Sequence, residues 1–86
     1  MKKYELTPEF IVTPFGAKLF RIKALLSFAN IKAGKLGGYI EKEGNLSQSG
    51  NAWVSGDAEV FGNARVFGDA RVYGNARVYG NRFLLG

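Results

Sequence analysis

The sequence predicts an all-β protein, a short parallel β-helix of six-residue repeats preceded by a β-hairpin. Glycine recurs at every sixth position from Gly50 to Gly80, and valine recurs at every sixth position from Val54 to Val78. A strict hexapeptide period is typical of parallel β-helices, in which each hexad supplies one short strand and one corner. We therefore expect the second half of the chain to wind as a solenoid.

The repeat at residues 75–80 shows why each position carries its residue. Ala76 and Val78 alternate with polar or aromatic residues, so they should face the interior while their neighbours face solvent. Gly-Asn or Gly-Asp makes the corner, because glycine takes positive φ freely and asparagine and aspartate tolerate it. An α-helix is excluded, since each glycine in its interior would cost about 1 kcal/mol. An antiparallel meander of hairpins is the alternative, but it would leave only four residues between turns, which is very short for its strands.

Residues 1–37 lack the hexad and predict an N-terminal β-hairpin cap. Residues 10–13 and 18–25 have the composition of strands, and Pro14-Phe15-Gly16 between them is a turn signal. In the second strand Phe20 and Ile22 share one face, while Arg21 lies on the other. We expect the hairpin to cover the open end of the helix, where free strand edges would otherwise invite aggregation.

Residues 38–86 form the predicted β-helix, which makes one structural domain with the hairpin. Its first two hexads, 38–43 and 44–49, keep the glycine but match the repeat weakly. In this phase Ile40 falls at the alanine position and Gln48 falls where valine is expected. Terminal repeats of solenoids are atypical because they cap the stack.

Composition places the chain among small folded proteins. It has 86 residues, no cysteine, 14% aromatic residues and a net charge of +5. The whole excess of positive charge lies in residues 1–37, which carry seven lysines and arginines and two glutamates. No stretch is long enough to span a bilayer, and the N-terminus lacks the apolar run of a signal peptide. We therefore expect a cytoplasmic protein.

A family resemblance rests on four parts of the sequence: YELT, LFRIKAL, IKAGKLGGYIEKEGNLSQSGNAWV and the tandem GNARVYG hexads. In these parts the chain resembles hexapeptide-repeat β-helix proteins of phages and prophages, a group that includes the bacterial YdcK family. The likeness covers nearly the whole chain. It implies a left-handed parallel β-helix with three hexads per coil, and it implies no particular activity.

Three hexads per coil would stack residues that are eighteen positions apart. The expected outward pairs are an ion pair, an aromatic pair and two cation–π pairs: Glu59 with Arg77, Phe61 with Tyr79, Trp53 with Arg71 and Arg65 with Phe83. At the corners, Asn51 should meet Asp69 and Asp57 should meet Asn75. Each exposed side-chain pair is worth only about 0.5–1 kcal/mol.

The residue inventory argues against an enzyme. Hexapeptide β-helices include acyltransferases, which by that resemblance would need a histidine base, and the chain has no histidine. Without cysteine or histidine the usual nucleophiles, bases and transition-metal ligands are missing. Asp57 and Asp69 stand at corners, where aspartate is ordinary turn chemistry. We therefore expect no catalytic residue, no metal site and no cofactor.

Two sets of residues are candidates for binding. The first combines basic and aromatic side chains of the repeats: Arg65, Arg71, Arg77, Arg82, Tyr73 and Tyr79. Basic groups beside aromatic faces suit nucleotides or single-stranded nucleic acid. However, successive hexads face different sides, so we expect these arginines to converge only between subunits.

The second set is the apolar run Phe83, Leu84 and Leu85, predicted to contact another copy of the chain. A run that folds back as a plug over the end of the helix is the alternative. Three functions stay open: an oligomeric protein that binds and inhibits a host or defence protein, a nucleotide or nucleic-acid binder, and a structural or virion component.

Overall fold

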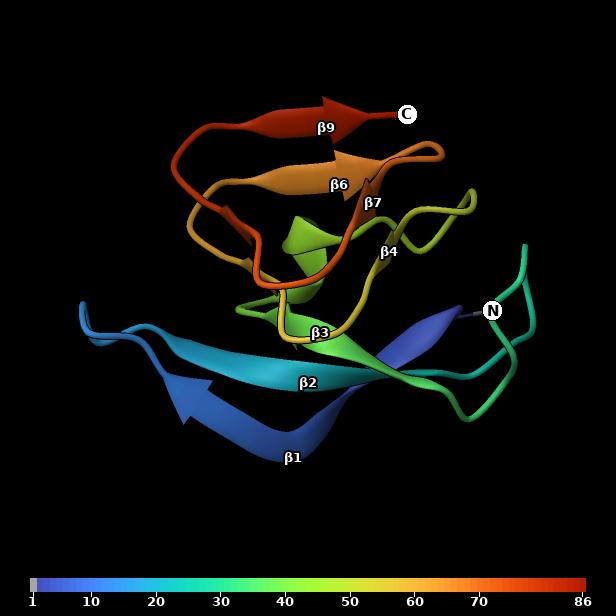
Figure 1. Ribbon diagram of the computed structural model, residues 1–86, viewed down its shortest axis with the longest axis horizontal. Coiled ribbons are helices and arrows are strands. Elements are labelled where there is room, and N and C mark those ends of the chain that lie inside the picture. The colour runs from blue at the N-terminus through green and yellow to red at the C-terminus, as the bar shows by residue number, and fades with distance from the viewer. Residues whose placement is uncertain (1) are drawn as a thin grey trace.

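The computed structural model describes residues 2–86 as an assembly of strands with a single 3₁₀ turn (Figure 1). The long elements come first: β1 (Tyr4–Val12), β2 (Lys18–Ala24) and β3 (Leu36–Ile40). They are followed by η1 (Glu43–Asn45), β4 (Trp53–Val54), β5 (Glu59–Val60), β6 (Arg65–Phe67), β7 (Arg71–Val72), β8 (Arg77–Val78) and β9 (Phe83–Leu85). No helix within residues 2–86 is long and apolar enough to cross a membrane.

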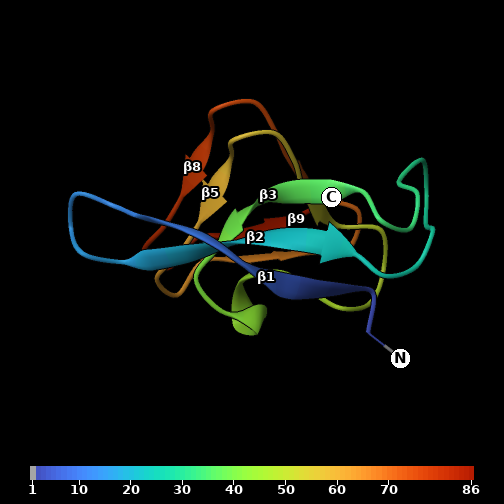
Figure 2. The same ribbon diagram turned by 90° about the horizontal axis from the view of Figure 1, so that it is seen from below.

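The repeats wind as a three-sided β-solenoid. Strands on the same side pair in parallel, twenty residues apart in the first coil and eighteen residues apart from β4 onward. We name the sides the hairpin face (β3, β5, β8), the flap face (β4, β7) and the groove face (Leu46, β6, β9). Figure 2 shows β5 and β8 side by side, one level apart. The register pairs Glu59 with Arg77 and Arg65 with Phe83, so the predicted period of the coil is confirmed.

The core is built from the two inward positions of the repeat. Its alanines and valines are nearly inaccessible to solvent: Ala52, Ala58, Ala64, Ala70, Val54, Val60, Val66, Val72 and Val78. The corner glycines from Gly50 to Gly80 all have φ between 63° and 74°. At Gly50 a Cβ atom would also lie 2.8 Å from the carbonyl oxygen of Gly68, so both conformation and space require glycine.

The phase predicted for the first coil is wrong by two residues. Ile40 pairs with Val60, so it holds the valine position and not the alanine position. Leu46 faces Val66, and it fills the place that the sequence pattern gave to Gln48. The two extra residues lie between Leu46 and β4. They let Gln48 turn away from the core, where its Oε1 accepts hydrogen bonds from the backbone N–H groups of Lys3 (2.7 Å) and Tyr4 (3.3 Å).

The N-terminal hairpin extends the hairpin face of the solenoid. β1 pairs with β2 and β2 pairs with β3, both antiparallel, which gives one sheet in the order β1-β2-β3-β5-β8. β1 begins at Tyr4, six residues before the expected start of the strand, and the turn closes at Gly16. Tyr4, Ile22 and Ala24 are buried in the same core as the repeat valines.

Residues 25–35, which we call the flap, lie over the flap face. Phe28 of the flap meets the ring of Trp53 edge-on at 5.4 Å, and Asn30 accepts a hydrogen bond from Arg71 at 2.9 Å. Trp53 is therefore 2% exposed, although the sequence placed it on the outer surface. Trp53 and Arg71 are paired in the β-ladder as predicted, but within residues 2–86 they make no cation–π contact because Phe28 covers the indole.

Candidate functional site

A groove of about 560 Å³ opens on the groove face, between η1 and strands β6 and β9. It arises because the first coil contributes only Leu46 to this side, while η1 carries Glu43 outward. Its lining combines charged, polar and apolar residues: Glu43, Gly44, Leu46, Ser47, Gln48, Arg65, Val66, Phe67 and Phe83. The floor is apolar and the rim is polar, which is the common composition of a binding site.

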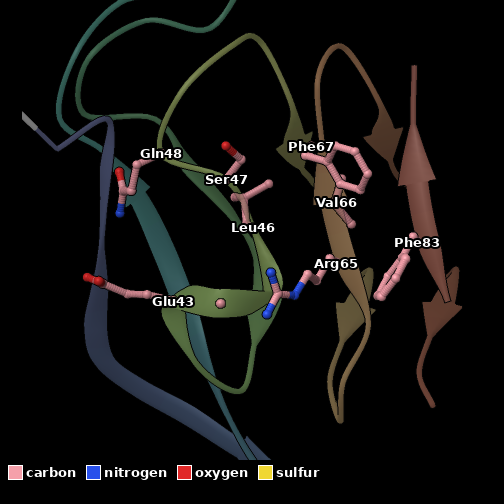
Figure 3. A pocket seen from close by; sticks show the side chains of 9 residues that line it. Glu43, Leu46, Ser47, Gln48, Arg65, Val66, Phe67 and Phe83 are labelled. Carbon is pink, nitrogen blue, oxygen red and sulfur yellow. The ribbon is translucent and has the colours of Figure 1, made fainter. Parts of the chain in front are cut away.

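Arg65 occupies the middle of this groove. Figure 3 shows its side chain reaching from β6 toward η1, with the ring of Phe83 beside it and the ring of Phe67 further along β6. Within residues 2–86 no carboxylate forms an ion pair with Arg65. Glu43, the acidic residue of the lining, is paired with Lys2 at 2.7 Å.

A second hollow of about 290 Å³ adjoins the groove on the other side of Arg65. Gly44, Arg65 and Phe83 line both spaces, and Lys42, Asn63, Ala64 and Asn81 complete the second. Asn63 donates a hydrogen bond to Asn81 at 3.3 Å, one coil above it. Arg65 and Phe83 thus form a ridge between two neighbouring depressions.

The other predicted binding residues are distributed over the remaining sides. Arg77 lies on the hairpin face 3.7 Å from Glu59, and Tyr79 stacks on Phe61 with ring centroids 5.3 Å apart. Both of these predicted pairs are confirmed. Arg71 and the exposed Tyr73 belong to the flap face.

Arg82 precedes β9 and is also exposed. Of the six candidates, Arg65 alone lines the groove, so one chain does not bring the arginines together. At the corners Asn51 bonds Asp69 at 3.3 Å as expected, whereas Asp57 lies 3.7 Å from Arg21 of the hairpin.

The apolar run at residues 83–85 forms strand β9 instead of a plug. Leu84 faces inward opposite Val66, while Phe83 and Leu85 are 63% and 70% exposed. The outward pair therefore belongs to the groove face, and Phe83 is shared with the groove. Arg65 and Phe83 are paired in the ladder as predicted, and no cation–π contact is formed between them within residues 2–86.

Two buried polar residues near the groove were not recognised from the sequence. Tyr4 is fully buried, and its hydroxyl donates to the carbonyl oxygen of Leu46 and lies 3.1 Å from that of Glu43. Burial, followed by the charge of Glu43, raises the pKa of Tyr4 above its ordinary value. Lys3 is 3% exposed, and burial lowers its pKa to about 8. Both residues hold β1 against the first coil.

The polar groups that line the groove are hydroxyl, amide, carboxylate and guanidinium groups. Ser47 and Ser49 share a hydrogen bond of 3.1 Å, and no histidine exists in the chain to act as their base. Among residues 2–86 no group of three or more acidic side chains is arranged to hold a metal ion. What the groove offers a ligand is one guanidinium, two aromatic rings and several hydrogen-bonding side chains.

Comparison with known families gives one match. The family model described as the YdcK beta solenoid repeat matches residues 70–86. These residues contain β7, β8 and β9, one strand from each side of the solenoid. The match and the structure agree that the chain carries β-solenoid repeats. No curated protein matches the sequence.

Proposed function

We propose that the protein is a non-catalytic, homo-oligomeric β-solenoid that binds another protein through the groove on its groove face. The observation that carries the proposal is the placement of Arg65, Phe67 and Phe83 around one depression. Arginine and aromatic residues are enriched at protein–protein interfaces, and they supply most of the binding energy where they fill pockets.

The scaffold suits such a role. Arg65 and Phe83 stand on adjacent strands of one parallel ladder, so backbone hydrogen bonds fix their spacing. Arg65 donates its backbone N–H to the carbonyl of Arg82 at 2.9 Å, which ties the two rungs together beside the groove. A backbone that is already ordered before association loses little conformational entropy on binding, and this favours tight binding.

The finer identity of the fold also belongs to this proposal. We propose a left-handed coil of hexapeptide repeats, of phage or prophage origin, that acts in the host cytoplasm and inhibits a host or defence protein. The resemblance of the sequence to such proteins and the solenoid-repeat match at residues 70–86 support it. Fold-level analogy alone does not identify the target.

Nucleotide or nucleic-acid binding is the second candidate, favoured by the unpaired guanidinium of Arg65 beside two aromatic rings. The spread of the remaining arginines over three sides disfavours it for a single chain. Association of copies would bring arginines of different chains together, which is the form of this function that the sequence favours.

Affinity capture with matched variants tests the proposal. Wild-type protein, Phe83→Ala and Tyr73→Ala are immobilised and exposed to host lysate, and retained proteins are quantified by mass spectrometry. Tyr73 is 72% exposed on a different side, so its variant controls for general loss of surface apolar area. We expect one host protein to be retained by wild type and Tyr73→Ala, and to fall at least about tenfold with Phe83→Ala.

The captured protein is then purified and titrated against all three forms. Equal affinity for wild type and Phe83→Ala contradicts the proposed site. Retention of nucleotides or nucleic acid in its place supports the second candidate.

A further inference from the structure

We infer that the groove holds an extended, acidic segment of the partner, with one carboxylate on Arg65 and an apolar side chain, two residues along the segment, between Phe67 and Phe83. The inference rests on the proposed function and names the chemistry of the partner that the same site selects. Three features of the groove carry it: an unsatisfied charge, a double depression and a polar rim.

Arg65 is the arginine of the groove, and like Arg71 and Arg82 it forms no ion pair with a carboxylate within residues 2–86. Arg21 lies against Glu9 at 3.0 Å and Asp57 at 3.7 Å, and Arg77 lies against Glu59 at 3.7 Å. A guanidinium forms its strongest hydrogen bonds with a carboxylate, often through two parallel N–H groups, so a carboxylate is the natural complement of Arg65.

The surroundings of Arg65 strengthen the preference for an anion. Glu43 is neutralised by Lys2 at 2.7 Å, and Lys42 lines the second hollow. The whole chain carries a net charge of +5. An acidic partner is therefore attracted over a distance as well as in contact, and a basic segment is repelled.

The shape of the site suits an extended chain. The two hollows lie on either side of the ridge formed by Arg65 and Phe83. In an extended segment, residues two apart point to the same side at a spacing of roughly 6.5–7 Å. Such a segment can place a carboxylate against Arg65 in one hollow and an apolar side chain, two residues along, in the other.

Polar side chains stand where the backbone of such a segment needs partners. Ser47 lines the first hollow, and Asn63 and Asn81 line the second. Their hydroxyl and amide groups can both donate and accept hydrogen bonds, as a peptide backbone requires. Leu46 and Val66, paired across the floor of the first hollow, supply the apolar surface.

These features favour a peptide segment over nucleic acid. Single-stranded nucleic acid needs positive charge along a backbone track. Here Arg71 is engaged by Asn30 on the flap face and Arg77 is paired with Glu59 on the hairpin face. The groove itself contains one arginine and a largely apolar floor.

A displayed library of random twelve-residue peptides tests the inference. The library is sorted against labelled wild-type protein, Arg65→Glu, Arg65→Lys, Phe83→Ala and the control Tyr73→Ala. We expect wild type and Tyr73→Ala to enrich peptides with Asp or Glu two residues from Phe, Leu or Ile. Arg65→Glu should bind the selected peptides at least about tenfold more weakly.

Further measurements on a selected peptide separate the outcomes. Its affinity should fall as salt rises from low to physiological ionic strength, and Arg65→Lys should restore part of what Arg65→Glu loses. Enrichment without any preference for acidic residues, or no enrichment at all, overturns the inference. So does binding of a single-stranded oligonucleotide that Arg65→Glu abolishes while peptides stay unbound.

The result is distinguishable from failure of the proposed function. If Phe83→Ala weakens capture of the host protein but Arg65→Glu does not, the groove is a protein-binding site and the acidic segment is wrong. If neither variant changes capture of the host protein, both the proposed binding site and the inference of an acidic segment are wrong.

Discussion

At the scale of single residues, Lys3 is the most unusual group in the structure. Its side chain is buried with no carboxylate partner among the ion pairs of residues 2–86. The ammonium group donates to the carbonyl oxygens of Ala52 (2.7 Å) and Gly50 (3.4 Å), and it lies 4.7 Å from the centroid of the Phe28 ring. Lys3 therefore joins β1, the flap and the first coil at one point.

The lowered pKa of Lys3 predicts a pH-dependent stability. Burial lowers this pKa from 10.5 to about 8, so between these values the unfolded chain binds more protons than the folded one. The free energy of unfolding should therefore rise with pH across that window, by about 1–3 kcal/mol. Urea midpoints at several pH values measure it, and the series stops near pH 10, where unfolded tyrosines begin to ionise.

Two variants identify the source of that pH dependence. Lys3→Met should abolish the rise, whereas Lys32→Met, at an exposed position of the flap, should retain it. A rise that persists in Lys3→Met assigns the effect to another group.

At the scale of elements, the flap combines a strained turn with an unpaired polar group beneath it. Residues 27–33 form a small two-stranded turn closed by hydrogen bonds between Phe28 and Ile31 (2.9 and 2.8 Å). Ala29 in this turn has φ 47°, which is unfavourable for any residue with a Cβ atom. Beneath the flap, the indole N–H of Trp53 has no hydrogen-bond partner within residues 2–86. An unpaired buried donor costs about 1–3 kcal/mol, which favours opening.

Trp53 is the single tryptophan of the chain, so its fluorescence reports the flap directly. Ala29→Gly relieves the backbone strain and should raise the free energy of unfolding by about 0.5–1 kcal/mol, with less acrylamide quenching of Trp53. Phe28→Ala removes the covering ring and should increase quenching. The matched control is Ala33→Gly, at a flap position without positive φ, which should not stabilise. Equal effects of the two glycine substitutions would contradict the strain argument.

The elements also show how far the sequence determines the fold. Residues 50–79 repeat without interruption, and the valines from Val54 to Val78 and the alanines from Ala52 to Ala70 are buried as the pattern predicts. In the last coil the prediction fails for Ala76, which is exposed, and Arg82 stands exposed at the next alanine position. The pattern breaks down where tertiary contacts compete with it. Gln48 has the sequence phase of a core residue, yet hydrogen bonds to the backbone of β1 hold it outside while Leu46 takes its place. Trp53 has the phase of a surface residue, yet Phe28 buries it.

At the scale of the whole molecule, the groove face is the natural place for contact between copies. Leu85 is 70% exposed there and does not line the groove, so self-association through it leaves Arg65 accessible. We expect light scattering to show an oligomer at low micromolar concentration, and Leu85→Ser to shift it toward the monomer because exposed apolar area is lost. Tyr73→Ser serves as the control, and a wild-type monomer at that concentration would overturn the prediction.

The groove was only partly predictable from the sequence. Arg65 and Phe83 follow from the eighteen-residue spacing, since that spacing places them on adjacent rungs of one side. The opposite wall of the groove cannot be predicted from this spacing, because η1 interrupts the repeat. The outward course of η1 depends on Asn45. The amide of this buried residue bonds the carbonyls of Gly62 (3.2 Å) and Ala64 (2.8 Å). A pattern of apolar positions contains no signal for a side chain that anchors a turn in this way.

From β4 onward the ladder keeps an eighteen-residue register, and this spacing determines how the architecture can change length. Duplication of eighteen residues adds one coil, about 4.8 Å in height. Every later side chain then lies on the same side of the solenoid as before. A duplication of six or twelve residues instead turns everything downstream by one or two sides of the prism, and moves Phe83 away from Arg65. Tandem duplication of eighteen-residue units can therefore lengthen the solenoid and keep the groove face unchanged.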